Sequence, residues 1–340
     1  MNKIILAISI FLTACGCQGV IQNWQKDRLL NHLNRIKNYH GTFSETGVLD
    51  SKEPLVSEVW FEAPGKYSIS VKSPPKYAGT QLSYDGSTMQ IYYPQTKFAI
   101  IYKNVQPLTA EDGQKLIEDL FHTNVDSFHY TMGPKSKLAG HPVIQMEFRA
   151  KSDHLFIANG ESKIYDEYSM PLATELHYRD GNDYGYSFSE IKFNAESITL
   201  PKPAIPADTI VSEWDMNSKG LTEENLKAQA GIKVRLPKNL PNGLKLNKII
   251  KQAGPVPAFT ALYEKKPYSL SVIFFKDYGI SGIPSGRGLK VNTGKIKGRL
   301  LPNPHVSSYS FIDRGIQYVL IGNIPVEGIV EVAKEIGSQP

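Results

Sequence analysis

The most chemically versatile residues of the chain are its two cysteines, Cys15 and Cys17, which both lie near the N-terminus. A thiol can form a disulfide, bind zinc or act as a nucleophile. The 340-residue chain has no cysteine after Cys17, so the rest of the chain can contain no disulfide, no cysteine-bound zinc and no cysteine nucleophile. A cysteine placed directly after an apolar run indicates instead a modification of the cysteine itself.

Serine, histidine and glycine patterns that could support catalysis occur only in weak forms. Ser73 and Lys76 have the spacing of a Ser-x-x-Lys pair, but the two prolines between them disfavour the helix that this pair requires. His122 and His129 are seven residues apart, which is more typical of surface or core histidines than of metal ligands. The glycine-rich segment 282–288 lacks the strand–loop–helix context that binds phosphate, so we interpret it as a flexible loop.

We therefore expect no catalytic residue, no metal site, no cofactor and no enzymatic activity. The Gly-x-Ser-x-Gly and His-Glu-x-x-His motifs are both absent from the sequence. The 33 Asp and Glu residues leave open a carboxylate pair, and with it a cell-wall hydrolase as a minor alternative. The 38 Lys and Arg residues are dispersed and give a net charge of only +5, which argues against nucleic-acid binding.

The N-terminal residues have the organisation of an export signal. A lysine precedes the uncharged, mostly apolar run Ile4–Ala14, which is too short to span a bilayer. The run ends in Leu12-Thr13-Ala14-Cys15, which resembles the bacterial lipobox. This resemblance implies that residues 1–14 are a signal peptide, that Cys15 is lipidated and that residues 15–23 are a tether. We expect a membrane-anchored, extracytoplasmic envelope protein, periplasmic in a host with two membranes; an ordinary secretory signal is the alternative.

After the tether, hydrophobic periodicity predicts one helix and then a long series of strands. Residues 24–39 carry apolar side chains at helical spacing, and Gly41 is expected to end this helix. From Thr42 to Leu200 the period is two, in short runs separated by turns, which predicts a large antiparallel sheet of hairpins. A second helix, at 109–123, is expected to interrupt the sheet.

The stretch from Pro201 to Lys238 is rich in proline and polar residues, so we expect a domain boundary there. It contains a short helical pattern at 222–230. A smaller domain follows, with strands predicted at 268–275 and 318–321. Pro325 is expected to open a last helix that has Gly337 as its C-cap and these residues facing inward: Ile329, Val332, Ala333 and Ile336.

The order and spacing of the segments in residues 24–200 resemble a known group of bacterial envelope proteins. This group comprises the lipoprotein carriers LolA and LolB and the envelope-stress regulators RseB and MucB, which share an N-terminal domain. The similar pieces are Trp60–Tyr67, Tyr84–Pro94, Met170–Asn182 and Phe188–Asn194. Three further pieces resemble the small C-terminal domain of the RseB and MucB regulators: Leu236–Leu244, Leu262–Phe274 and Gly322–Pro325.

The resemblance implies an α+β fold with two domains. The first, at 24–204, would be a half-open antiparallel β-barrel of the LolA type, with the helix at 109–123 among its lid helices. A linker at 205–238 would lead to a smaller α+β domain at 239–340. A half-barrel of this kind would curve over an apolar cavity that suits acyl chains.

Strand parity nominates residues that could line such a cavity, because alternate side chains of a strand share a face. The alternative is that these residues fill an ordinary core. The candidates are Tyr67, Ile69, Val71, Ile91, Tyr93, Phe98, Ile100, Met146 and Phe148.

The sequence therefore favours a non-enzymatic envelope lipoprotein that binds lipid, or the acyl chains of a lipoprotein, in envelope-stress sensing or lipoprotein handling. The main alternative is a protein-docking regulator that binds a membrane-anchored anti-sigma factor and has no physiological lipid ligand. A purely structural envelope lipoprotein is a further alternative.

Overall fold

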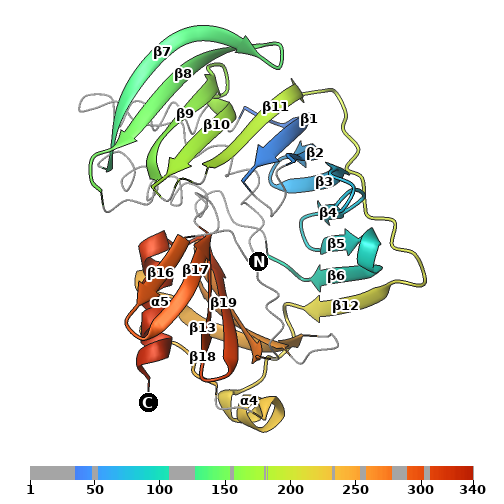
Figure 1. The fold of residues 1–340 in the computed structure, drawn as a ribbon. Helices are drawn as coiled ribbons and strands as arrows, with labels where there is room; N and C mark the ends of the chain where they lie inside the picture. Colours follow the sequence, from blue (N-terminus) through green and yellow to red (C-terminus); the bar gives the residue numbers. More distant parts are fainter. Residues whose placement is uncertain are drawn as a thin grey trace. The chain divides into compact units, whose positions relative to one another are not determined.

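The computed structural model describes residues 35–47, 53–106, 127–153, 157–179, 181, 183–231, 234–252, 258–277, 289–301 and 307–339. The chain forms two compact units, of which the first ends at Met216 and the second begins at Asn217. Each unit is built on one β-sheet (Figure 1).

The first unit contains a twelve-stranded sheet in the order β12-β6-β5-β4-β3-β2-β1-β11-β10-β9-β8-β7. The sheet is open, with β12 and β7 at its edges, and Figure 1 shows it curving along the long strands β7 and β8. All neighbouring strands are antiparallel except β12 and β6, which are parallel. The elements are β1 (Asn38–Thr46), β2 (Leu55–Glu62), β3 (Lys66–Ser73), β4 (Gln81–Tyr84), β5 (Met89–Tyr93), the 3-10 helix η1 (Pro94–Thr96), β6 (Phe98–Lys103), β7 (Phe128–Leu138), β8 (His141–Ala150), β9 (Ile157–Tyr165), β10 (Met170–Tyr178), β11 (Asp183–Phe193) and β12 (Ile210–Asp215).

The period-two runs of the sequence form strands where they are predicted, and short turns join them into hairpins. The β4–β5 turn shows the local chemistry. Gly86 has a φ of +103°, which disfavours residues with a side chain. The Asp85 carboxylate accepts hydrogen bonds from the backbone N–H groups of Ser87, at 3.1 Å, and Thr88, at 2.9 Å.

The second unit contains a seven-stranded antiparallel sheet in the order β13-β14-β15-β19-β18-β17-β16. The last predicted helix is confirmed, and its four predicted inward residues are buried. The predicted cap is wrong: the helix runs to Ser338, and Gly337 lies against Ile296, whose side chain a Cβ would meet at 2.4 Å. The elements are α4 (Glu223–Ala230), the 3-10 helix η2 (Pro241–Gly243), β13 (Lys245–Gln252), β14 (Ala258–Lys265), β15 (Tyr268–Lys276), β16 (Leu289–Thr293), β17 (Ile296–Leu301), β18 (Ser307–Asp313), β19 (Ile316–Gly322) and α5 (Val326–Ser338).

The helix predicted at 24–39 is wrong at its C-terminal end, because β1 begins at Asn38. Gly41 lies inside this strand and does not end a helix. A Cβ at Gly41 would lie 2.5 Å from the carbonyl oxygen of Glu190, so glycine permits the close approach of β11. Residues 35–37 are described and are not helical either. Residues 24–34 of that helix, the predicted helix at 109–123, the signal peptide, the tether and Cys15 lie outside the described residues.

The stretch 205–238, predicted as a linker, contributes a strand to the first sheet and a helix and an isolated bridge to the second unit. β12 pairs with β6 in the first sheet. α4 begins at the predicted helical pattern, where the Thr222 hydroxyl accepts a hydrogen bond from the Asn225 N–H at 3.1 Å. Leu221 forms an isolated bridge with Ile249 of β13. None of the described helices is long and apolar enough to cross a membrane.

Candidate functional site

Seven aromatic side chains and one methionine form a continuous row across eight neighbouring strands of the first sheet, from β11 to β12. Each residue of this aromatic row is the direct cross-strand partner of the next, so all lie on the same face. We call this side of the sheet the apolar face. The aromatic row consists of Phe193, Tyr39, Phe61, Tyr67, Tyr84, Met89, Tyr102 and Trp214.

Ring contacts connect the aromatic row. The Tyr39 and Phe61 rings stack with centroids 5.1 Å apart, and the Tyr102 and Trp214 rings meet edge-to-face at 4.9 Å. Burial raises the pKa of the Tyr84 and Tyr102 hydroxyls to about 12, and raises that of Tyr67 further. The phenols are therefore uncharged at neutral pH, and the row presents no charge to a bound molecule.

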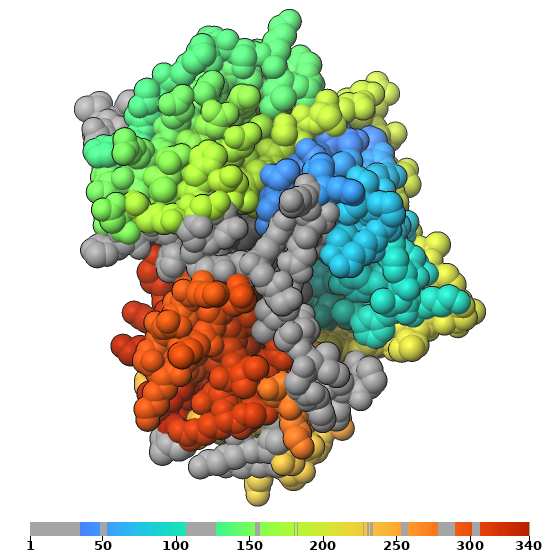
Figure 2. All heavy atoms as spheres, viewed as in Figure 1, coloured from blue at the N-terminus to red at the C-terminus, as the bar shows by residue number. Residues whose placement is uncertain are grey.

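An aliphatic row lies beside the aromatic row on the apolar face. Its residues are again direct cross-strand partners: Val59, Ile69, Leu82, Ile91 and Ile100. Two of the predicted cavity residues, Tyr93 and Phe98, come next on the same face and stack with ring centroids 6.5 Å apart. Tyr93 is 36% exposed, and the β5, β6 and β12 end of the sheet reaches the surface in Figure 2.

The other half of the sheet contributes Met146 and Phe148 of β8, which are buried. Phe148 lies against Gly160 of β9: a Cβ at that position would lie 2.4 Å from the Phe148 ring, so glycine makes room for the ring. Met146 and Phe148 belong to one buried cluster, and Tyr67 and Ile91 to a second. Phe61 and Ile69 pack against both clusters and make them continuous.

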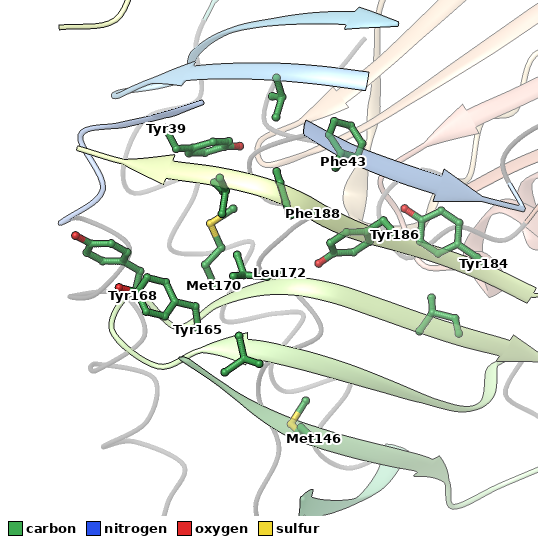
Figure 3. Close-up of a cluster of buried hydrophobic side chains, with 14 of the residues drawn as sticks. Tyr39, Phe43, Met146, Tyr165, Tyr168, Met170, Leu172, Tyr184, Tyr186 and Phe188 are labelled. Atoms are coloured by element: carbon green, nitrogen blue, oxygen red, sulfur yellow. The ribbon is translucent and has the colours of Figure 1, made fainter. Parts of the chain in front are cut away.

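The structure thus brings most of the nine sequence-predicted residues into one connected apolar surface. Tyr67, Ile91, Met146 and Phe148 are buried members of its clusters, and Ile69 and Ile100 pack against them. Val71, Tyr93 and Phe98 have the same strand parity but belong to neither cluster. The sequence analysis did not predict the residues of β1, β10 and β11 that belong to the same buried cluster as Met146 and are labelled in Figure 3: Tyr39, Phe43, Met170, Leu172, Tyr184, Tyr186 and Phe188.

A row of polar residues crosses the apolar face between β9 and β1. By register, Ser162 lies opposite Thr174, Thr174 opposite Tyr186, and Tyr186 opposite Glu45. The hydroxyls of the first two lie 3.0 Å apart, and the Thr174 hydroxyl lies 3.3 Å from that of Tyr186. We call these four residues the polar row. No motif in the sequence marks them, because only the strand register brings them together.

Ionisable groups on the opposite face form ordinary ion pairs. The Glu58 carboxylate lies 2.9 Å from Nε2 of His40 and 2.7 Å from Nζ of Lys72. His40 also stacks on Trp60, with ring centroids 4.8 Å apart. Among the residues that the structure describes, no group of three or more His, Cys, Asp and Glu side chains could hold a metal ion.

Comparison with known proteins gives structural likenesses only. No family model and no curated protein matches the sequence. The chain resembles MucB. A structure of MucB in complex with MucA(peri) is 16% identical, with a TM-score of 0.46, over 92% of this chain and 97% of that one. The Pseudomonas aeruginosa MucA/MucB complex structure is 17% identical, with a TM-score of 0.46, over 92% of this chain and 98% of that one.

The chain also resembles a member of the LolA superfamily over about half of its length. A member from Nitrosomonas europaea is 11% identical, with a TM-score of 0.24, over 54% of this chain and 98% of that one. The resemblance predicted from the sequence, to MucB-like and LolA-like proteins, is confirmed as a likeness of fold. Function has to be argued from the chain's own geometry.

Proposed function

We propose that the chain is a non-enzymatic, extracytoplasmic lipoprotein whose apolar face binds acyl chains of a lipid or of another lipoprotein. The observation that carries this proposal is the pair of adjacent rows, aromatic and aliphatic, on one face of a curved sheet. In this proposal the sheet is the half-open barrel predicted from the sequence, and its nine candidate residues line the cavity.

Physical chemistry supports this ligand class. Acyl chains bind by removing apolar area from water, worth about 25 cal/mol per Å², and need no directional partner. The aromatic row offers rings whose hydroxyls are uncharged or already hydrogen-bonded, as that of Tyr84 is to the Val105 carbonyl at 3.3 Å. A surface with these properties accepts a flexible hydrocarbon chain better than a polar metabolite.

Lipidation of Cys15 completes the proposal. An acyl anchor of two or more chains, at about 0.8 kcal/mol per buried CH₂, would hold the protein stably at a membrane. Its apolar face would then work close to a source of acyl chains. Mass spectrometry of the protein isolated from membranes tests this step: a diacylglyceryl group on an N-terminal Cys15 is expected, and an unmodified N-terminus elsewhere would contradict it.

The binding proposal is tested with native mass spectrometry of the Cys15→Ser chain from a bacterial periplasm. We expect an adduct of lipid mass that is lost on denaturation, and uptake of a fluorescent acylglycerol, whose head group is an uncharged ester. Ile100 and Ile101 provide a matched pair of variants, because they are half-buried neighbours on β6 that point to opposite faces. Ile100→Gln is expected to weaken uptake about tenfold, because it places an amide on the apolar face.

Ile101→Gln is the control, since its amide lies on the other side of the sheet and uptake should remain close to that of the unmodified chain. Thermal unfolding of both variants shows whether each is folded. A clean apo mass with no uptake by the folded protein would contradict lipid binding. Equal losses in the two variants would contradict the assignment of the face.

A second candidate function is protein docking by the second unit. α5 covers the face of the sheet that holds Tyr318 and Leu320, which are fully buried. On the other face Val319 and Ile321 are half-buried, and Ile312 is 50% exposed. Since MucB has been solved with MucA, we propose as the alternative that this face docks an extended, apolar segment of a membrane-anchored anti-sigma factor.

Variants of two exposed isoleucines, one in each unit, test the docking function. Ile312→Asp is expected to abolish co-purification of a single-span membrane protein if the second unit docks it. Ile210→Asp, at a residue of the first unit that is 68% exposed, is the control and should leave co-purification unchanged. The docking function is contradicted if Ile312→Asp retains the partner.

A further inference from the structure

Three of the four residues of the polar row have their hydroxyl groups hydrogen-bonded within the sheet. The hydroxyls of Ser162 and Thr174 bond each other, and the Tyr186 hydroxyl donates to the Pro171 carbonyl at 3.3 Å. Glu45, at the end of the row on β1, has one hydrogen-bond partner among the described residues, the Tyr184 hydroxyl at 3.2 Å. One carboxyl oxygen of Glu45 is therefore left for a further partner.

The surroundings of Glu45 contain no compensating positive charge among the described residues. On β11 it faces the phenols of Tyr184 and Tyr186, and Leu55 lies opposite it on β2. Tyr178 of β10 is the next phenol in this group. Asp183, at the start of β11, pairs instead with His177 of β10, Oδ1 to Nδ1, at 2.7 Å.

The protonation state of Glu45 follows from these neighbours. Burial of the carboxyl group raises its pKa to about 7, and the hydrogen bond from Tyr184 opposes this rise. Below that pH Glu45 is a neutral acid that can donate a hydrogen bond to a carbonyl oxygen. Above it Glu45 is an anion on an apolar face, with no cationic partner among the described residues, and it repels any second carboxylate.

We propose that Glu45 selects the head group of the acyl ligand: the apolar face takes chains with an uncharged, ester-type head group and rejects chains that end in a carboxylate. This inference rests on the proposed acyl-chain binding and specifies its ligand class. Diacylglyceryl groups of lipoproteins and neutral glycerolipids have such ester head groups, whereas free fatty acids are carboxylates.

The test compares two ligands with the same chain, laurate and monolaurin, below their critical micelle concentrations. Binding to the full chain carrying Cys15→Ser is measured between pH 6 and 9 by displacement of a fluorescent apolar dye. Laurate affinity is expected to fall about tenfold per pH unit above pH 7, as the fraction of protonated Glu45 falls. Monolaurin affinity should change less than threefold over the same range.

Three variants separate selection by Glu45 from a structural effect. In Glu45→Gln the laurate profile should become flat, with laurate binding at pH 8.5 at least tenfold tighter than in the unmodified chain. Tyr184→Phe removes the hydrogen bond that lowers the Glu45 pKa, so the midpoint of the laurate profile should move to higher pH. Glu58→Gln, on the opposite face, should keep the original profile.

The two proposals fail in different ways. If laurate affinity does not depend on pH, or if Glu45→Gln keeps the original slope, selection by Glu45 is overturned and acyl-chain binding stands. If the folded protein binds neither laurate nor monolaurin at any pH, both proposals are overturned.

Discussion

At the scale of single residues, two glutamates of the first sheet show how position decides the behaviour of one side-chain type. Glu45 lies on the apolar face, and burial raises its pKa to about 7. Glu58 is also partly buried, which acts to raise its pKa, but hydrogen bonds from Lys72 and His40 outweigh burial and hold it below the usual value. The two carboxyls therefore affect stability with opposite pH dependence.

Glu45 should make the protein less stable as pH rises. Its folded pKa of about 7 exceeds the ordinary value of 4.5 for a glutamate carboxyl, so the native state binds more protons than the unfolded state between these two values. The contribution of the Glu45 carboxyl to the free energy of unfolding is fully present below pH 4.5. It is lost as pH rises through about 7, and the loss is at most about 3 kcal/mol. In urea unfolding, Glu45→Gln should match the unmodified chain near pH 4.5 and be more stable at pH 8.

Glu58→Gln is the contrasting variant for this measurement. Because the folded pKa of Glu58 is lowered, its contribution is present at neutral pH and is lost as pH falls through the folded pKa. Glu58→Gln should therefore be less stable than the unmodified chain at pH 8. Parallel stability profiles for Glu45→Gln and the unmodified chain would contradict the raised pKa.

At the scale of elements, the strands were predictable because side-chain alternation is a local property of the sequence. The runs at 67–71 and 268–275 alternate clearly, and both are strands. Register is not local. The pairing of Glu45 with Tyr186 depends on a bulge between Thr42 and Phe43, for which the sequence has no signal. The polar row and the aromatic row could therefore not be predicted, although single members of the apolar face could.

Two segments form strands in the structure where the sequence predicted a helix end or a linker, and each difference has a physical reason. Tyr39 fits the apolar spacing of the preceding residues, so periodicity extended a helix into β1. The proline and polar residues of 201–238 favour a boundary, with a linker at 205–238, yet residues 210–215 form β12, the edge strand that pairs in parallel with β6. β12 forms a strand because it pairs with β6, which lies about 110 residues earlier in the chain. The ion pair between Lys103 of β6 and Glu213 of β12 spans this separation.

The edge strand β12 should be held mainly by its tryptophan. Trp214 meets the Tyr102 ring at 4.9 Å and donates a hydrogen bond from Nε1 to the Ser212 hydroxyl at 2.7 Å. Trp214→Ala should cost about 2 kcal/mol of unfolding free energy. The Lys103–Glu213 ion pair, at 2.6 Å between half-exposed side chains, should contribute less than about 1 kcal/mol.

Guanidinium unfolding of Trp214→Ala and Lys103→Ala measures this difference. Hydrogen exchange adds a local readout, because loss of β12 would expose amides of that strand before the rest of the sheet unfolds. If Lys103→Ala destabilises the protein as much as Trp214→Ala, the ion pair and not the ring contact would hold the strand.

At the scale of the whole molecule, the chain has two compact units, and each has its own sheet and its own buried residues. In the second unit Leu226 of α4 is buried. This unit also buries the ion pair between Arg235 and Asp313, at 2.7 Å, and the Arg235 backbone N–H donates to the Tyr318 hydroxyl at 3.2 Å. Residues 217–238 are thus part of this folding unit.

A fragment of residues 217–340 should therefore fold alone and unfold cooperatively, whereas 239–340, which starts where the sequence places the small domain, should be much less stable. The shorter fragment lacks the buried Leu226 and Arg235 and leaves the partly buried Asp313 without its arginine, a loss of about 3 kcal/mol or more. Circular dichroism and urea unfolding of both fragments measure the difference. Equal stabilities would show that residues 217–238 add nothing to the second unit, and an unfolded 217–340 would show that the second unit needs the first.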